Sequence, residues 1–428
     1  MKDFRQFFKD KKVTVVGLGL LGKRLGDIAF LAECGAKVLV TDLKTAKELA
    51  SSIKKLKKYK NIKYVLGKHR VQDFENCDFV LKGQGVALDS PYIMHARKKG
   101  IPIEMDESLF AKLAPKVKII GVTGTRGKST TTILIYEILK HTKKGVYLGG
   151  NIKGTAALPL LKKVKAEDTV VFELSSWQLQ GFGEDKISPH ISVFTNFMGD
   201  HMNYYKNSME DYFKDKSYIY KFQNKNDVLV LGPSMKKVKG LSKTITVKSL
   251  PKSWRVKLKG KHNLENIACA VEVARILKIK ENVIKKVVEN FRAIPGRLEL
   301  VKNVRGVEIY NDTNSTTPDA TIAALSSFDK KVILIMGGMD KFLDLKKLSK
   351  ILVQKTKDIF LTPGSGGDRI ENSKIKKVKN LKEAIHQAFR VAKKGDIILF
   401  SPAFASFNLF KNEYDRGEKF MKIVNKLK

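Results

Sequence analysis

The stretch KIIGVTGTRGKSTTTILIYEIL, residues 118–139, determines the fold predicted for the rest of the chain. It begins with an apolar run typical of a buried strand, passes through a glycine- and threonine-rich turn, and ends in a helical pattern. Such a turn points backbone N–H groups inward at a helix N-terminus, where anions bind. Lys128 would add a positive charge for the outer phosphates, and the hydroxyl of Ser129 or Thr130 could bind Mg²⁺. The sequence therefore predicts a mononucleotide site on a strand–turn–helix unit.

This phosphate loop is a shortened form of the general P-loop pattern. The general pattern places a glycine five residues before its second glycine, and that position is Val122 here. What remains is G-T-x-G-K-S-T at residues 124–130. The alternative is a glycine-rich turn that only links a strand to a helix, and the surrounding strand–turn–helix pattern favours the phosphate site.

A second nucleotide pattern lies near the start of the chain. Residues 13–22, VTVVGLGLLG, run from an apolar strand into Gly17-x-Gly19-x-x-Gly22, and a helical pattern follows. The next predicted strand ends at Asp42, the acid that this fingerprint places about 20 residues further on. By itself the fingerprint favours a dehydrogenase domain that binds a nicotinamide dinucleotide. A further glycine-rich loop, at residues 83–85, follows another predicted strand.

Polar residues end the predicted strands of the central third. Residues 169–176, TVVFELSS, end near Glu173, which could bind Mg²⁺ or simply cap a helix. A strand at residues 190–195 leads to His201, although a lone histidine is more often structural. Lys216 falls on a helical pattern rich in tyrosine and lysine, where the residues alone assign it a place on the surface.

The last third begins again as an α/β pattern. Four predicted strands end in polar loops at residues 311–318, 337–341, 363–367 and 401–407. Because the carboxyl ends of parallel strands meet at one edge of a sheet, these loops predict a ligand-binding rim. A Pro-Gly pair at residues 294–298 marks the boundary before this unit and predicts a hinge.

The patterns together predict an α/β protein of three domains. The N-terminal domain, residues 1–104, is expected to be Rossmann-like and to bind a nucleotide. The central domain, residues 105–294, is expected to be a P-loop-type mononucleotide-binding α/β domain, and the C-terminal domain, residues 295–428, to be Rossmann-like α/β. A chain of 428 residues is too long for one ordinary core, which agrees with this division.

The charge of the chain is unusual, with 82 Lys and Arg against 43 Asp and Glu and a net charge of +39. Such a balance suggests nucleic-acid binding, but the lysines are spread along the chain and no nucleic-acid-binding motif is evident. Solvated lysine-rich surfaces therefore explain the charge better. No apolar run could span a membrane, no signal core is apparent, and the three cysteines lie far apart, so we expect a cytoplasmic protein without membrane insertion.

Several longer motifs occur in the order found in the Mur ligases. They are TGTRGKST, FELSSWQL, TNFMGDHMNYY, GKHNLENIACA, IPGRLE, YNDTNSTTPDATIAAL, MGGMDK and SPAFASFNLFKNEYDRGEKF. The chain resembles this family over nearly its whole length, and its two ends are most similar to the members that add D-glutamate. The resemblance implies that the first domain holds the UDP of one substrate, the second holds ATP and Mg²⁺, and the third brings in the amino acid. It thereby explains why one chain has two nucleotide patterns.

The resemblance also implies roles for individual residues. For ATP these are Gly124, Thr125, Gly127, Lys128, Ser129, Thr130, Asn263, Asn266, Arg297 and Asp312. For the UDP substrate they are Gly17, Leu20, Leu21, Asp42, Gly83, Gly85 and Asn151, and for the amino acid Thr316, Lys341 and Ser406. Two Mg²⁺ ions would be bound by Ser129, Glu173, His201 and Lys216, the last as a carbamoylated lysine. The implied catalytic residues are Lys128, Glu173, His201 and Lys216.

The activity implied is ATP-dependent ligation of D-glutamate to UDP-N-acetylmuramoyl-L-alanine through an acyl phosphate, in the synthesis of peptidoglycan precursors. We expect a monomer that acts on these small molecules and binds no specific nucleic acid. Arg126, Gln84 and Asn314 depart from the family pattern and concern the choice of substrates. The alternatives are a Mur-type or folylpolyglutamate-synthase-like ligase with another acceptor, and a non-catalytic basic protein that binds nucleotides or nucleic acid. The N-terminal fingerprint disfavours the folate type.

Overall fold

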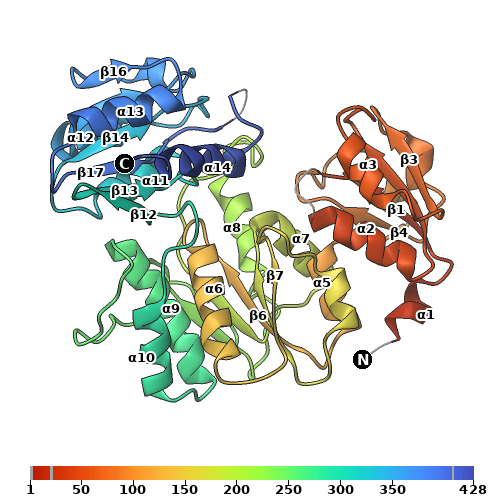
Figure 1. The fold of residues 1–428 in the computed structure, drawn as a ribbon. Coiled ribbons are helices and arrows are strands. Elements are labelled where there is room, and N and C mark those ends of the chain that lie inside the picture. Colours follow the sequence, from red (N-terminus) through yellow and green to blue (C-terminus); the bar gives the residue numbers. More distant parts are fainter. Residues whose placement is uncertain (1–2, 20–22, 407–408) are drawn as a thin grey trace. The chain divides into compact units, whose positions relative to one another are not determined.

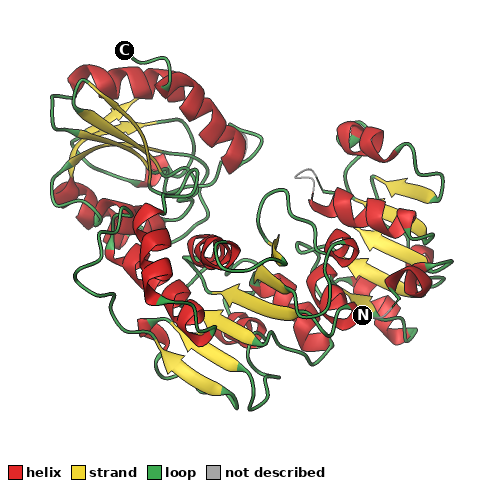
Figure 2. Ribbon diagram, turned by 60° about the horizontal axis from the view of Figure 1, so that its bottom comes forward, coloured by secondary structure: helices red, strands yellow, loops and turns green. Residues whose placement is uncertain are grey.

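The computed structural model describes residues 3–19, 23–406 and 409–428, which form three β-sheets of five, six and six strands (Figures 1 and 2). Two compact units make up the chain, residues 1–250 with 265–287 and residues 251–264 with 288–428. The first two sheets belong to the first unit and the third sheet to the second. The α/β fold class and its three sheets are confirmed, whereas the residue boundaries of three domains stay a prediction. The membership of residues 251–264 in the second unit was not anticipated.

The first sheet is parallel throughout and has the strand order β3-β2-β1-β4-β5. Its strands are β1 (Lys12–Val16), β2 (Lys37–Asp42), β3 (Ile62–Leu66), β4 (Phe79–Lys82) and β5 (Ile103–Glu104). Its helices are α1 (Phe4–Phe8), α2 (Lys23–Glu33), α3 (Ala50–Leu56) and α4 (Pro91–Lys98), with a short 3₁₀ turn at Val71–Phe74. Val15 packs with Ile28 of α2, and the next residue, Val16, packs with Ile93 of α4. Because neighbouring strand residues face opposite sides, helices cover both faces of the sheet.

The second sheet is also parallel and has the order β11-β10-β9-β6-β8-β7. Its strands are β6 (Lys118–Thr123), β7 (Val146–Gly150), β8 (Thr169–Glu173), β9 (Ile191–Phe194), β10 (Val228–Leu231) and β11 (Lys243–Thr246). The helices are α5 (Asp106–Leu113), α6 (Lys128–Lys140), α7 (Ser176–Glu184), α8 (Met209–Ser217), α9 (Lys261–Ile276) and α10 (Glu281–Asn290), with 3₁₀ turns at Leu158–Lys162 and Pro233–Met235. β6 lies between β8 and β9, so the phosphate loop that follows it emerges at the centre of the sheet.

The third sheet has the order β12-β13-β17-β14-β15-β16, in which only β12 runs antiparallel among the described strands. Its strands are β12 (Glu299–Val304), β13 (Val307–Asn311), β14 (Val332–Met336), β15 (Thr356–Leu361), β16 (Ile375–Lys377) and β17 (Ile397–Phe400). Its helices are α11 (Pro318–Leu325), α12 (Lys346–Lys355), α13 (Leu381–Val391) and α14 (Glu413–Val424), with a 3₁₀ turn at Gly367–Arg369. Leu334 packs into the core with α11 and α12, whereas its neighbour Ile335 packs with α13 and α14. Each face of this sheet is therefore covered by one pair of helices.

In every sheet the strands with predicted site residues are parallel, so their carboxyl ends meet at one edge. This edge holds the loops in which most of the predicted ligand contacts lie. None of the described helices combines the length and the apolar character needed to cross a membrane.

Candidate active site

The phosphate loop between β6 and α6 is built so tightly that two of its positions accept only glycine. Gly124 has φ +144° and Gly127 has φ +82°, values that side-chain-bearing residues rarely adopt. A Cβ atom on Gly124 would overlap the hydroxyl of Thr195, and one on Gly127 would overlap the amide of Asn266. The loop therefore lies directly against the segment that follows β9 and against α9, and it leads into α6, as the sequence predicts for a phosphate site.

Two lysine side chains converge on this loop. The Nζ atom of Lys128 donates to the backbone oxygens of Gly124 at 2.9 Å and Thr125 at 3.1 Å. The Nζ atom of Lys216, on α8, donates to the same oxygen of Gly124 at 2.9 Å. Lys216 is 1% exposed, and its Nζ lies 4.8 Å from the centre of the Tyr212 ring. The surface position that the residues alone suggested for Lys216 is thus wrong, because α8 folds back over the phosphate loop.

The environment of Lys216 favours its neutral amine. Burial lowers the pKa of Lys216 well below its ordinary value, and the nearby positive charge of Lys128 lowers it further. Asp200 and Asp215 act in the opposite direction and only partly offset this effect. A neutral lysine amine is a nucleophile, so this side chain is chemically unlike the solvated lysines elsewhere on the protein.

Glu173 lies at the end of β8, the strand next to β6. Its side chain is 2% exposed, and its Oε1 atom accepts a hydrogen bond from Asn151 Nδ2 at 3.2 Å. Its Oε2 atom is buried without a hydrogen-bond partner among the described residues. A buried carboxylate oxygen of this kind can be satisfied by a divalent cation. Asn151, predicted near the UDP substrate, therefore lies beside Glu173, directly after β7 of the second sheet.

The described residues contain no group of three His, Cys, Asp or Glu side chains placed to hold a metal ion by themselves. This fits Mg²⁺, which commonly takes one or two carboxylates and completes its shell with water and substrate phosphates. The donors that the loop offers are the orphan oxygen of Glu173 and the hydroxyl of Ser129 at the start of α6. These residues fit a magnesium ion that is bound together with a nucleotide.

His201 follows β9 and adopts a left-handed backbone conformation with φ +57°. Its ring centre lies 4.6 Å from that of Trp177, and its Nε2 atom is 3.6 Å from Asp200 Oδ2. Asp200 in turn forms an ion pair with Arg126 of the phosphate loop at 2.8 Å. Sequence reasoning missed this link between His201 and the loop. Arg126 gave one signal, as a charged residue where the family often has an amide.

The residues predicted to contact ATP are divided between the two units. Asn266 lies against the phosphate loop, where its backbone oxygen accepts from the Thr131 hydroxyl at 3.2 Å. Asn263, Arg297 and Asp312 belong to the second unit. The structure therefore places Asn266 beside Gly127 of the phosphate loop, and the roles of the other three residues stay a prediction.

Asp312 is buried, and its carboxylate is hydrogen-bonded to other groups of the second unit. Its carboxylate accepts hydrogen bonds from Leu298 N at 3.0 Å, Ser315 Oγ at 2.5 Å and Ser401 Oγ at 2.8 Å. Burial raises its pKa to about 6. The carboxylate thus ties the Pro-Gly segment to β13 and β17, a structural role that the sequence did not reveal. The hinge expected at residues 294–298 stays a prediction.

Three of the predicted UDP-substrate residues gather at the edge of the first sheet. Asp42 at the end of β2 accepts from Leu18 N at 2.8 Å, and Gly17 N donates to the Thr41 oxygen at 2.8 Å. Gly83 approaches β1 so closely that a Cβ atom would lie 2.7 Å from the Val16 oxygen. Gly17, Asp42 and Gly83 are therefore neighbours, as predicted.

The structure does not place the other residues predicted for the UDP substrate as close to Gly17, Asp42 and Gly83. Gly85 is exposed, and a Cβ atom added to it would meet no other atom of the described chain within 4 Å. Leu20 and Leu21 lie outside the described residues.

Lys82, at the end of β4, is a buried residue that sequence reasoning did not single out. Its Nζ atom donates to Val86 O at 2.7 Å and to Gly83 O at 3.3 Å. Burial, aided by the charge of Arg24, lowers its pKa to about 7. The side chain thereby folds the Gly83–Gln84–Gly85 loop over the sheet edge. The available signal was a lysine that ends the otherwise apolar strand FVLK.

The three residues predicted to bind the amino acid come together in the second unit. Lys341 Nζ donates to Thr316 Oγ1 at 3.3 Å. The loop of Lys341 and the loop of Ser406 are joined by a pair of backbone hydrogen bonds between Met339 and Ala405, at 2.9 and 3.0 Å. Three loops that follow β13, β14 and β17 thus meet as one polar rim, which is what the pattern of strand ends predicts.

Comparison with known families agrees with this arrangement of sheets and loops. The N-terminal domain of MurD-like Mur ligases matches residues 11–104, the Mur ligase middle domain matches residues 122–252, and the glutamate ligase domain of Mur ligases matches residues 296–404. The chain therefore belongs to the Mur ligase family, and the resemblance seen in its motifs is confirmed.

Within the family, particular relatives extend over the whole chain. UDP-N-acetylmuramoylalanine–D-glutamate ligase from Borreliella burgdorferi is 37% identical over 98% of both chains. The ligase of the same name from Clostridium kluyveri is 35% identical, covering 99% of this chain and 98% of the relative.

Solved structures of the family share the fold at lower identity. UDP-N-acetylmuramate–alanine ligase MurC from Thermotoga maritima aligns with a TM-score of 0.61 at 20% identity, covering 97% of this chain and 99% of that one. MurF ligase from the same organism, solved in complex with ADP, aligns with a TM-score of 0.62 at 18% identity, covering 100% of this chain and 99% of that one.

Proposed function

We propose that this chain ligates D-glutamate to UDP-N-acetylmuramoyl-L-alanine with the consumption of ATP. The observation that supports it most is the convergence of Lys128 and Lys216 on the Gly124 oxygen, beside a strand that ends in the orphan carboxylate of Glu173. This is a site for a polyanion that reacts, because it combines a phosphate loop, two amines and a cation-binding oxygen. The acceptor and the amino acid are inferred from the full-length relatives that have this name.

The first chemical step transfers a phosphoryl group. A carboxylate oxygen of the UDP substrate attacks the γ-phosphorus of ATP, the bond to the β-phosphate oxygen breaks, and ADP leaves. The product is an acyl phosphate. Lys128 and the N–H groups at the start of α6 stabilise the charge that spreads over the transferring oxygens. Asn266, packed against Gly127, fixes the shape of the loop during this step.

The second step forms the amide. The amine nitrogen of D-glutamate attacks the acyl carbon, a tetrahedral intermediate collapses with loss of phosphate, and the nitrogen gives up a proton. The chain's contribution is to position the amine, because two oriented reactants gain a large effective concentration. Thr316, Lys341 and Ser406 would hold the two carboxylates of the amino acid.

Bound Mg²⁺ would neutralise phosphate charge and orient the γ-phosphate. Ser129 and Glu173 would hold one such ion. For the second ion we propose His201 and Lys216. The neutral Lys216 amine can add to CO₂, forming a nitrogen–carbon bond and releasing one proton, which converts it into a carbamate with oxygen donors.

Lys341 provides a direct test of the amino-acid rim. Lys341→Ala should raise the KM for D-glutamate about tenfold, because a charge-assisted hydrogen bond to a carboxylate is lost, and should change the KM for ATP by less than about twofold. Lys346→Ala removes the same charge from an exposed position at the start of α12 and should change neither value. Steady-state kinetics with each substrate varied in turn gives both constants. Equal rises in both KM values would contradict the placement of the amino acid at this rim.

The proposed reaction is tested by phosphate release over a panel of amino acids with ATP, Mg²⁺ and UDP-N-acetylmuramoyl-L-alanine. Release that depends on D-glutamate supports the proposal. Release with another amino acid alone would indicate a different Mur-type ligase. Nucleic-acid binding that weakens steeply with salt, without any amino-acid-dependent release, would favour the non-catalytic alternative.

A further inference from the structure

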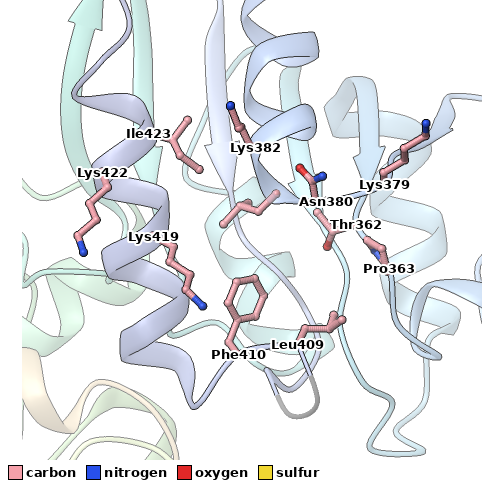
Figure 3. Close-up of a pocket in the computed structure, with 11 residues that line it drawn as sticks. Thr362, Pro363, Lys379, Asn380, Lys382, Leu409, Phe410, Lys419, Lys422 and Ile423 are labelled. Atoms are coloured by element: carbon pink, nitrogen blue, oxygen red, sulfur yellow. The ribbon is translucent and has the colours of Figure 1, made fainter.

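A cavity of about 520 Å³ lies in the second unit, between α13, α14 and the loop that follows β15 (Figure 3). Its floor is apolar and consists of Leu381, Leu409, Phe410 and Ile423. Leu409 is 40% exposed, which is high for a large apolar side chain next to a core. Cavities of this volume with apolar floors are typical of sites for small organic molecules.

Four lysines line this cavity besides its apolar floor, and in Figure 3 the amine of Lys419 points toward Phe410 whereas those of Lys379 and Lys422 point away from it. Lys379 and Lys382 lie at the start of α13, and Lys419 and Lys422 lie across from them on α14 (Figure 3). Lys419 forms an ion pair with Asp415 at 2.9 Å. Within the described ranges, no carboxylate lies within ion-pairing distance of Lys379, Lys382 or Lys422. Among the described residues that line the cavity, four are lysines and none is acidic, so the lining itself has a net positive charge.

The N-terminal end of α13 also favours a bound anion, and this helix, all of which is described, contributes no acidic residue to the cavity lining. Asn380 caps the helix, where its side chain accepts from Glu383 N at 2.9 Å. The Glu383 carboxylate, the nearest acid on this helix, is engaged by Lys379 N at 2.7 Å and by Gln387 Nε2 at 2.8 Å. The N-terminal end of a helix favours anions.

We propose that this cavity is a second ligand site, which binds a small amphipathic organic anion. The apolar floor would take an aromatic or short acyl body, and the lysines would pair with a carboxylate, phosphate or sulfonate head. None of the lining residues belongs to the sets expected for ATP, the UDP substrate or D-glutamate. The site thus goes beyond the proposed ligation, although Leu409 lies three residues after Ser406 on the same loop.

Two fluorescent probes distinguish the contribution of the apolar floor from that of the lysine charges. 8-Anilinonaphthalene-1-sulfonate has an aromatic body with an anionic head, and N-phenyl-1-naphthylamine has nearly the same body without the charge. With the full chain, we expect the sulfonate to bind at least about fivefold more tightly than the neutral amine at low salt, and this difference to shrink as salt screens the lysines.

Substitutions of lining residues test whether the sulfonate probe binds in this cavity. Lys382→Gln combined with Lys422→Gln should weaken binding of the sulfonate about fivefold to tenfold and leave the neutral amine unchanged, because two partly solvated charge pairs are lost. Lys426→Gln, one turn further along the chain from Lys422 and outside the cavity lining, is the matched control and should have no effect. Leu409→Glu places a negative charge in the floor and should abolish sulfonate binding.

Each result decides the proposal. Sulfonate affinity that is unchanged in the double lysine variant, or equally weakened in the control, would overturn it, as would a failure of the unmodified protein to bind the probe. Measuring D-glutamate-dependent phosphate release on the same samples keeps the two proposals apart. A chain that ligates but does not bind the probe retains its proposed function and loses only this second site.

Discussion

Lys128→Ala should reduce ATP-dependent phosphate release at least about 10²-fold to 10³-fold, the loss typical when one preorganised charge is removed from a developing anion. The structure adds a second reason. Lys128 Nζ bonds to the oxygens of Gly124 and Thr125, so its removal also loosens the loop that must surround the phosphates. Phosphate release at saturating substrates measures the effect.

The matched control is Lys144→Ala, an exposed lysine just beyond the other end of α6. It removes the same charge from the same unit and should keep full activity. Comparing the thermal unfolding of both variants distinguishes a lost catalytic charge from a misfolded protein. Turnover of a folded Lys128→Ala protein within about threefold of the unmodified enzyme would refute the assignment of this loop.

Lys216→Ala should have an effect of similar size, and this effect should be partly reversible. The substitution removes a fully buried side chain between Tyr212 and the Gly124 oxygen, and with it the proposed carbamate. A short carboxylic acid such as acetate or formate can supply a carboxylate where the carbamate stood. We expect each acid to restore part of the phosphate release as its concentration rises, and chloride at equal ionic strength to restore none.

Two further measurements make this prediction specific. Lys214→Ala, on the same helix but exposed, should be fully active without added acid. Unmodified protein equilibrated with ¹³C-bicarbonate should show a carbamate signal by NMR that Lys216→Ala lacks. A fully active Lys216→Ala variant, or a severe loss that no acid relieves together with an absent carbamate signal, would count against a carbamoylated lysine.

The local motifs of this chain were sufficient to predict the fold and the phosphate loop. The pattern around Lys128 predicts a strand, a turn and a helix because all of its determinants lie within a few residues of one another. The polar rim of Thr316 and Lys341 was also predictable, since parallel strands place their carboxyl ends at one edge.

What the sequence could not reveal depends on packing between distant segments. Lys216 lies 92 residues from Gly124, and Arg126 lies 74 residues from Asp200. No local pattern distinguishes a lysine that will be buried by such a contact from one that stays in solvent. The same holds for Asp312, whose partner Ser401 lies 89 residues away. The partners of Lys82 are local, at Gly83 and Val86, and what the sequence could not reveal there is that the side chain is buried.

The most direct test of the central claim uses UDP-N-acetylmuramoyl-L-alanine whose free carboxylate is labelled with ¹⁸O. The chain is incubated with this substrate, ATP, Mg²⁺ and D-glutamate, and both the nucleotide product and the released phosphate are examined by mass spectrometry. We predict a product extended by a D-glutamyl residue, and phosphate that contains one labelled oxygen, because an acyl phosphate passes a carboxylate oxygen to phosphorus. Unlabelled phosphate, or the absence of the extended product, would contradict the account.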